Sequence, residues 1–160
     1  QEPVYSGVGV ERFTADEPRG RLLLLETPAE APPDATWEVT ALVAVGPKDV
    51  LPAARAVLGA SRVVGLLARW DGERFRPEQA PFEGGIHRLW VESPAVLWAT
   101  DRQGNLWRGR GERWRRVAWQ PPEPAGTEIT RVWVRGPNDV WLLTSRLGEN
   151  TSAVYHGRLP

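Results

Sequence analysis

The sequence of 160 residues contains no cysteine and no methionine. Without cysteine, disulfide bonds, thiolate metal ligands and cysteine nucleophiles are excluded. Basic and acidic residues balance at 20 each, so no net charge attracts nucleic acid, anionic lipid or acidic substrates. No apolar run approaches the roughly 18 residues of a membrane-spanning helix, and no transmembrane segment is expected. Because methionine is absent even before Gln1, we expect a processed product, for example one that has lost a secretory signal, or an excerpt of a longer protein.

Three segments of the chain share one pattern, in which a run of alternating apolar residues leads into a turn and a second apolar run. The clearest copy is Thr130–Trp141, which reads Thr-Arg-Val-Trp-Val-Arg-Gly-Pro-Asn-Asp-Val-Trp. His87–Trp98 repeats it, and Thr40–Leu51 repeats it more faintly. The turn prolines of neighbouring copies are 47 and 43 positions apart. A period of this length is typical of repeat proteins.

Each copy predicts a β-hairpin. Alternation with a period of two is the mark of a half-buried strand. A Pro-Asn-Asp turn reverses the chain, because proline presets φ while Asn and Asp bond to nearby backbone. Downstream, Gly104–Trp114 adds two further strands, which Leu67–Phe75 and Ala153–Arg158 match in part. A complete repeat therefore has four strands, and the last repeat lacks its fourth.

The repeats predict an all-β fold, a single propeller-like domain of about three to four blades, each a four-stranded antiparallel sheet. The expected parts are N-terminal strands and a linker (1–36), repeat 1 (37–79), repeat 2 (85–120) and an incomplete repeat 3 (127–159). Because so few blades rarely close a ring, we expect the open edge to be closed by N-terminal strands or by a partner. Val4–Phe13, which resembles Leu106–Trp114, is the candidate for such a strand.

Two regions interrupt the pattern. Ala29–Asp34 is rich in proline and alanine and is expected to be a linker or surface loop. Pro52–Leu58 has helical composition where repeat 1 should have its second strand, and Pro52 suits a first helical turn. We expect an edge strand distorted by an insertion there, with a short helix as the alternative.

The repeats resemble a family of bacterial propeller repeats with a Pro-Asn-Asp-Val-Trp turn, which occur in large secreted or surface proteins. The resemblance rests on Val132–Trp141, Gly104–Trp114 and Arg69–Gly72, and it covers residues 37–159. Repeat 1 departs from the motif, because Leu51 stands in place of its tryptophan. The family implies a β-propeller and an extracytoplasmic setting, whether periplasmic, cell-surface or secreted. It carries no catalytic residues that could be transferred.

Nine tryptophans suggest ligand stacking. Four of them occupy repeated strand positions, where packing between blades is the simpler role: Trp90, Trp98, Trp133 and Trp141. Less regular tryptophans and neighbouring arginines form the candidate binding surface: Trp107, Arg108, Arg110, Trp114 and Trp119. Strand alternation sends neighbouring side chains to opposite faces, and acidic residues dilute the arginines, so nucleic acid is not an expected partner.

No cofactor and no metal site is expected. His87 and His156 stand at non-equivalent repeat positions, and a zinc site would need further ligands. Asp101–Asn105 lacks the alternating carboxylates of a calcium loop and predicts a plain turn. The carboxylates that could serve an enzyme are more simply explained as turn formers: Asp71, Glu73, Asp101 and Glu112.

The sequence thus predicts a non-enzymatic interaction or structural module, a subunit of an extracytoplasmic protein assembly. Abundant Arg and Trp favour interfaces, and the missing fourth strand predicts a protein partner that completes or covers the open propeller edge. The alternative is a propeller module that binds a carbohydrate or another surface ligand through Trp107, Trp114 or Trp119.

Overall fold

The computed structural model describes residues 9–12, 21–25, 35–46, 49–58, 62–78, 84–120, 126–136, 139–146 and 148–158. In these residues every regular element is a β-strand, and all paired strands run antiparallel. The predicted all-β class is therefore confirmed. The described part of the chain has no helix with the length and apolar character needed to cross a membrane.

The chain forms two compact units, residues 1–87 and residues 88–160. The first unit contains a two-stranded sheet and a four-stranded sheet, and the latter (the first sheet) keeps its strands in chain order. The strands are β1 (Gly9–Arg12), β2 (Arg21–Leu24), β3 (Trp37–Gly46), β4 (Asp49–Leu58), β5 (Arg62–Trp70) and β6 (Phe75–Glu78).

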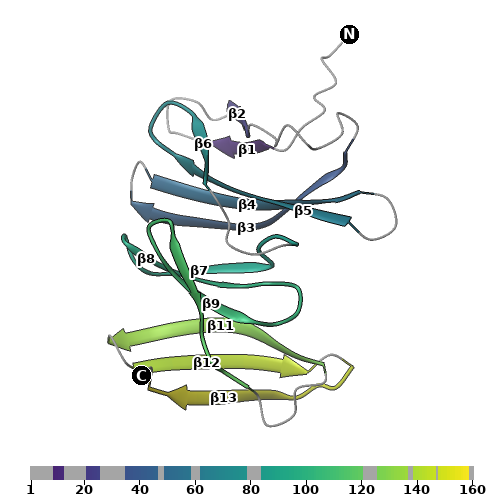
Figure 1. Ribbon diagram of the computed structural model, residues 1–160, viewed down its shortest axis with the longest axis vertical. Coiled ribbons are helices and arrows are strands. Elements are labelled where there is room, and N and C mark those ends of the chain that lie inside the picture. Colours follow the sequence, from purple (N-terminus) through teal and green to yellow (C-terminus); the bar gives the residue numbers. More distant parts are fainter. Residues whose placement is uncertain are drawn as a thin grey trace. The chain divides into compact units, whose positions relative to one another are not determined.

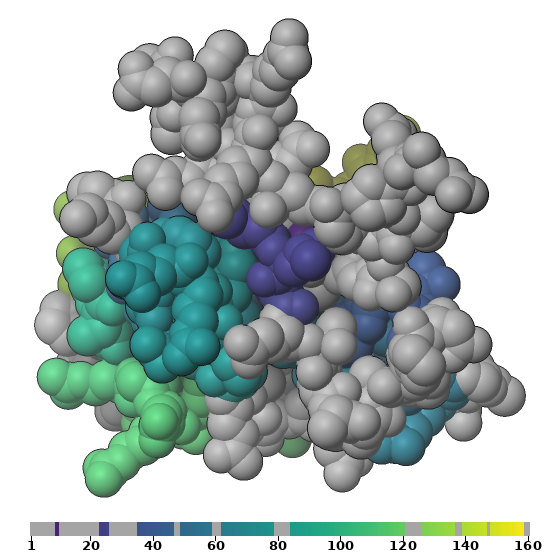
Figure 2. Space-filling model, turned by 90° about the horizontal axis from the view of Figure 1, so that it is seen from above, coloured from purple at the N-terminus to yellow at the C-terminus, as the bar shows by residue number. Residues whose placement is uncertain are grey.

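Apolar side chains of both sheets form the core of the first unit. Leu25, directly after β2, packs with Ala54, Leu66 and Phe75, and none of the four is more than 4% exposed. Ala54 and Leu66 lie opposite each other in the β4–β5 ladder, so one face of the first sheet is turned toward β1 and β2. The two sheets lie together in Figure 1, and Figure 2 shows the purple residues of β2 beside the teal residues of β5 and β6.

The second unit contains a four-stranded sheet (the second sheet) and a three-stranded sheet (the third sheet), each again in chain order. The second sheet consists of β7 (Arg88–Ser93), β8 (Val96–Thr100), β9 (Leu106–Arg110) and β10 (Arg113–Arg116). The third sheet consists of β11 (Thr127–Gly136), β12 (Asp139–Arg146) and β13 (Ser152–Gly157).

The second and third sheets pack face to face. Trp98 and Leu106 of the second sheet contact Ile129, Val140 and Leu142 of the third, and none of these side chains is more than 5% exposed. Full burial of one such apolar side chain contributes about 1.5–3 kcal/mol. The core of this unit therefore lies between consecutive sheets (Figure 1).

The repeated sequence folds as a repeated hairpin, as predicted. In each hairpin the first strand has a register shift one residue before its end: Ala44/Gly46 in β3, Val91/Ser93 in β7 and Val134/Gly136 in β11. The extra residue at such a bulge redirects the strand as it enters the turn. The predicted turn residues Pro47, Pro137 and Asn138 lie outside the described residues.

The prediction for Pro52–Leu58 was correct in expecting a strand and wrong in expecting an edge strand. These residues form the second half of β4, which is an inner strand paired with β3 on one side and β5 on the other. Pro52 lies opposite Leu42 of β3, whereas pairing with β5 begins only at Ala53. Pro52 therefore sits where β4 has one neighbour, and its missing N–H removes no bond of the β4–β5 ladder.

The described part of the candidate strand Val4–Phe13 does not pair with the third sheet. Gly9–Arg12 pairs with Arg21–Leu24 in a sheet of its own, and the third sheet has three strands among the described residues. The rest of the candidate strand Val4–Phe13 and the predicted linker Ala29–Asp34 lie outside the described residues.

In the first unit the backbones at Gly65 and Gly85 approach each other closely. A Cβ atom at Gly65 in β5 would lie 2.2 Å from Cα of Gly85, a backbone atom that cannot turn aside. We expect Gly65→Ala to lower the free energy of unfolding by about 1–3 kcal/mol or more, as measured by guanidinium unfolding followed by tryptophan fluorescence. Gly46→Ala is the matched control, because its Cβ would meet only ordinary contact at 3.8 Å. Equal stabilities of the two variants would contradict the close approach of the backbones.

Candidate functional site

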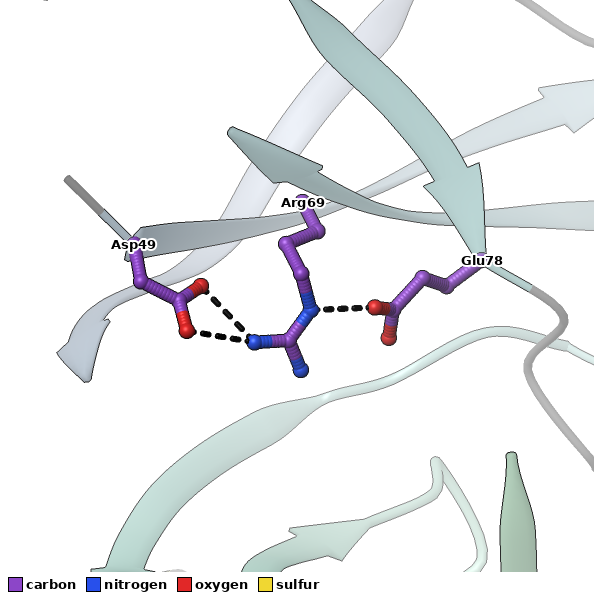
Figure 3. A network of polar contacts seen from close by, with 3 residues as sticks. All are labelled: Asp49, Arg69 and Glu78. Atoms are coloured by element: carbon purple, nitrogen blue, oxygen red, sulfur yellow. Dashed lines mark hydrogen bonds and ion pairs between the residues drawn. The ribbon is translucent and has the colours of Figure 1, made fainter. Parts of the chain in front are cut away.

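A basic side chain stands at the same repeat position of the third strand in every large sheet. In the first sheet it is Arg69, whose Nη1 donates to both carboxylate oxygens of Asp49 at 2.7 Å. Arg69 Nε donates to Glu78 of β6, so one guanidinium joins β4, β5 and β6 (Figure 3). Burial by itself lowers the pKa of Arg69, but Glu78 and Asp49 outweigh it and the net pKa is raised.

In the second sheet the basic residue is Arg108 of β9. It donates through Nε and Nη2 to the two carboxylate oxygens of Glu92, at 2.9 and 2.8 Å, and lies over the Trp98 ring at 5.7 Å. Glu92 also accepts a bond of 2.8 Å from Trp98 Nε1. Burial by itself raises the pKa of Glu92, but the bonds from Arg108 and Trp98 and the charge of Arg108 outweigh it, so the net pKa is lowered.

In the third sheet the corresponding residue is His156 of β13. Its Nε2 lies 2.6 Å from Oδ1 of Asp139, and its ring stacks on Trp141 with centroids 4.3 Å apart and planes 18° apart. No carboxylate takes the place of Glu92 here, because Arg135 stands at that position of the repeat. Trp141 Nε1 is shielded from solvent and has no hydrogen-bond partner within the described part of the chain. A buried donor without a partner costs about 1–3 kcal/mol.

The residues of the predicted binding surface do not lie together on one face of the second sheet. Trp107 and Gly109 of β9 lie on one face of the second sheet, and Trp114 stands opposite Gly109. By strand alternation Arg108 and Arg110 point to the other face. Arg108 is engaged by Glu92, as described above, whereas Arg110 is exposed near the end of β9.

The three predicted surface tryptophans have different surroundings. Trp107 Nε1 donates to Oδ2 of Asp101 at 3.0 Å. The ring of Trp114 lies against Gly109, where a Cβ would come within 2.5 Å of it. Trp119 follows β10 and meets Tyr155 of the third sheet edge-on, with ring centroids 6.0 Å apart. Trp119 therefore lies at the junction of the second and third sheets.

The expectation that four repeated tryptophans pack between sheets was correct for the second sheet and incomplete for the third. Trp98 is fully buried and Trp90 packs against the same core. Trp133, however, is 61% exposed, and Trp141 is half-buried. The reason is positional: the third sheet covers Trp98, whereas within the described residues of this unit no further sheet covers the corresponding face of the third sheet.

The sequence predicted that the last repeat lacks its fourth strand, and among the described residues β13 is the last strand of the third sheet. The registers make Gly157 of β13 the counterpart of Gly109 of β9, since each stands opposite the same repeat position, Val140 or Leu97. At Gly109 the ring of Trp114 fills the space, whereas a Cβ at Gly157 would meet no atom within 4 Å. The space that a β10 tryptophan fills beside Gly109 in the second sheet is therefore not filled by described residues beside Gly157 in the third.

A pocket of about 210 Å³ adjoins this edge. It is lined by apolar core residues of both sheets of the unit and by the end of β13, including Trp98, Leu106, Trp119, Tyr155 and Gly157. The pocket and the β13 edge together form the candidate site. Its signal in the sequence was the shared glycine of β9 and β13, which aligning the repeats residue by residue would have revealed.

Two of the four carboxylates considered for catalysis, Asp101 and Asp71, shape turns, as the sequence predicted. Asp101, 4% exposed, accepts bonds of 2.9 Å from the backbone N–H groups of Gln103 and Asn105. Asp71 accepts from the N–H groups of Arg74 and Glu73, and these bonds hold the pKa of its carboxyl well below the ordinary value. The described residues contain no cluster of three or more His, Asp or Glu side chains suited to a metal ion.

Comparisons of this chain with protein-family models, with curated protein sequences and with solved structures found no match.

Glu92 gives the second unit a predictable response to acid. Because its pKa is lowered from 4.5 in the folded state, its contribution to stability is present above pH 4.5 and is lost as the pH falls through the folded-state pKa. We expect Glu92→Gln to destabilise the protein by about 1–3 kcal/mol at pH 7, because two donors lose a charged acceptor. Its melting temperature should then fall less steeply than that of the wild type below pH 4.5. Thermal unfolding between pH 7 and pH 3 measures both effects.

Glu112→Gln is the control, because Glu112 is exposed. The network around Glu92 would be refuted if the two variants had the same acid profile.

Proposed function

We propose that this chain is a non-enzymatic interaction module, a subunit of an extracytoplasmic protein assembly, whose third sheet is completed by a strand from a protein partner. One observation carries the proposal. The third sheet repeats the second strand for strand from β7 to β9, yet the position of β10 has no strand among the described residues. An edge strand presents unpaired N–H and C=O groups, which a further strand can pair with.

We take the sheets to be blades of a propeller. Units of four short antiparallel strands, with a repeat of about 40 residues, are typical of propeller blades. The face-to-face packing of the second and third sheets is the contact that neighbouring blades make. In this interpretation the third sheet is an incomplete blade. We therefore expect the added strand to run antiparallel to β13, as β6 and β10 run antiparallel to β5 and β9.

The site suits the addition of an extended segment. In this mode of recognition the backbone bonds of the added strand give affinity, and pockets for alternate side chains give specificity. β13 offers an edge that pairs with no further strand among the described residues, and the pocket at Gly157 and Trp119 offers the side-chain site. The equivalent positions of β6 and β10 hold aromatic residues, Phe75 and Trp114, so we expect the added strand to carry an aromatic residue there.

A carbohydrate is the second candidate, and one observation favours it. Trp119 and Tyr155 line the same pocket, and paired aromatic rings provide stacking surfaces for sugar rings. Quenching of tryptophan fluorescence by sugars, removed by Trp119→Ala, is the result expected of this candidate. Addition of a partner strand does not predict that sugars quench the fluorescence.

A peptide made from the chain's own fourth strand tests the proposal. The peptide Gly-Glu-Arg-Trp-Arg-Arg-Val copies residues 111–117, and we expect the full chain to bind it with its tryptophan over Gly157. Gly157→Val should abolish binding without unfolding the protein, because the added side chain enters the open space beside residue 157 and fills it. Fluorescence anisotropy of a labelled peptide measures the affinity, and circular dichroism checks the fold.

Two controls isolate the edge. Gly136→Val also places a side chain in open space, but in β11 at the opposite edge, and should leave binding unchanged. A peptide with proline at its second arginine lacks a ladder N–H and should bind at least tenfold more weakly. Equal binding of wild type and Gly157→Val would refute strand addition at β13.

A further inference from the structure

The outer face of the third sheet, turned away from the second sheet, carries exposed apolar and basic side chains. Trp133, Leu143 and Val154 are 61%, 37% and 63% exposed. Trp141 lies beside Trp133 in the register, and its Nε1 is a buried donor without a partner in the described residues. This face holds both an apolar surface and an unsatisfied polar group.

The second sheet shows which group is missing. There Glu92 receives the indole N–H of Trp98 at 2.8 Å and both donors of the Arg108 fork. Glu92 is the bulge residue between Val91 and Ser93 of β7. Arg135 is the bulge residue at the same place in β11, between Val134 and Gly136. The third sheet has therefore exchanged the carboxylate for a guanidinium at the position that serves the tryptophan.

The charges of this face are complementary to an acid. Arg131 and Arg135 of β11 and Arg158 after β13 are exposed, and His156 lies on the same face as Trp141. The acid beside them, Asp139, is already bonded to His156 at 2.6 Å. A carboxylate at the place of Glu92 would meet an indole donor and a guanidinium at once, and charge-assisted bonds of this kind are about twice as strong as neutral ones.

We propose that the outer face of the third sheet binds a carboxylate side chain of a partner protein, which takes the place that Glu92 holds in the second sheet. The carboxylate accepts from Trp141 Nε1 and from Arg135. The exposed rings and aliphatic groups around it, Trp133, Leu143 and Val154, favour an acid carried by a protein surface over a small free acid, because a protein covers them. This site is independent of strand addition at the β13 edge.

Nuclear magnetic resonance of the full chain tests the proposal directly. The reporter is the indole N–H of Trp141, assigned by its loss in Trp141→Phe. The probes are the capped peptide Ser-Val-Glu-Val-Ser and its counterpart with Gln in place of Glu. We expect the acidic peptide to move the Trp141 resonance downfield in a saturable way, and the Gln peptide to bind at least about tenfold more weakly, since hydrogen bonds to a charged acceptor are the stronger ones.

Arg135→Glu restores an internal acceptor and gives a second readout. We expect its Trp141 resonance to stand at the downfield position without any peptide, and the acidic peptide to cause no further shift. Arg131→Glu makes the same change of charge on the same face, away from the bulge, and should leave the free resonance in place. An unmoved resonance in Arg135→Glu, or equal binding of the two peptides, would overturn the proposal.

Two further experiments test whether the carboxylate comes from an acidic sugar or from a second copy of the chain. If glucuronate moves the resonance and the peptide does not, the site belongs to an acidic sugar and the proposal fails. If light scattering shows that the chain self-associates and that Arg135→Glu abolishes this, the acid comes from a second copy, which also overturns a separate partner. A monomer that binds only the acidic peptide supports the proposal.

Discussion

The structure depends on one constraint: a sheet that is apolar on both faces has to be covered on both faces. Trp98 shows the constraint met, since it lies on the face of the second sheet that the third sheet covers and is fully buried. Its counterpart in the third sheet, Trp141, has the same place in the strand and the same register to its neighbours. The cover over the two tryptophans differs. The repeat therefore specifies how each sheet is built, while the position of the sheet in the series determines what its outer face has to contact.

The same reasoning applies to the edges. β10 lies along β9, and Trp114 closes over Gly109, so the space at Gly109 is filled within the second sheet. A glycine recurs at Gly157 of β13 although the described residues place no aromatic ring over it. Gly157 is the last residue of β13, and a glycine in a strand often marks a place that another group approaches closely. Its presence in β13 is best explained by a group that arrives from elsewhere, which agrees with the strand addition proposed above.

The sequence predicted the strands well and their surroundings poorly. Alternation and turn chemistry are local, so the hairpins and the turn-forming role of Asp101 could be predicted from short stretches. The helical composition around Pro52 led to the prediction of a distorted edge strand, whereas pairing with both β3 and β5 makes β4 an inner strand. Trp133 misled the prediction because exposure depends on the neighbouring sheet, which no local pattern encodes. Arg108 looked like a ligand residue, but its partner Glu92 lies 16 positions away and only the register brings them together.

The contrast between Glu92 and Arg135 goes further than a difference in exposure. In the second sheet the acid at the bulge satisfies an indole and a guanidinium within the sheet itself. In the third sheet the residue at the bulge adds a donor where an acceptor is needed, and Trp141 Nε1 is left without a partner in the described residues. An unsatisfied buried donor lowers stability. A third sheet that contacted no partner would therefore be more stable with an acid at residue 135. The arginine is therefore better explained by a partner that supplies the acid than by the fold of this chain alone.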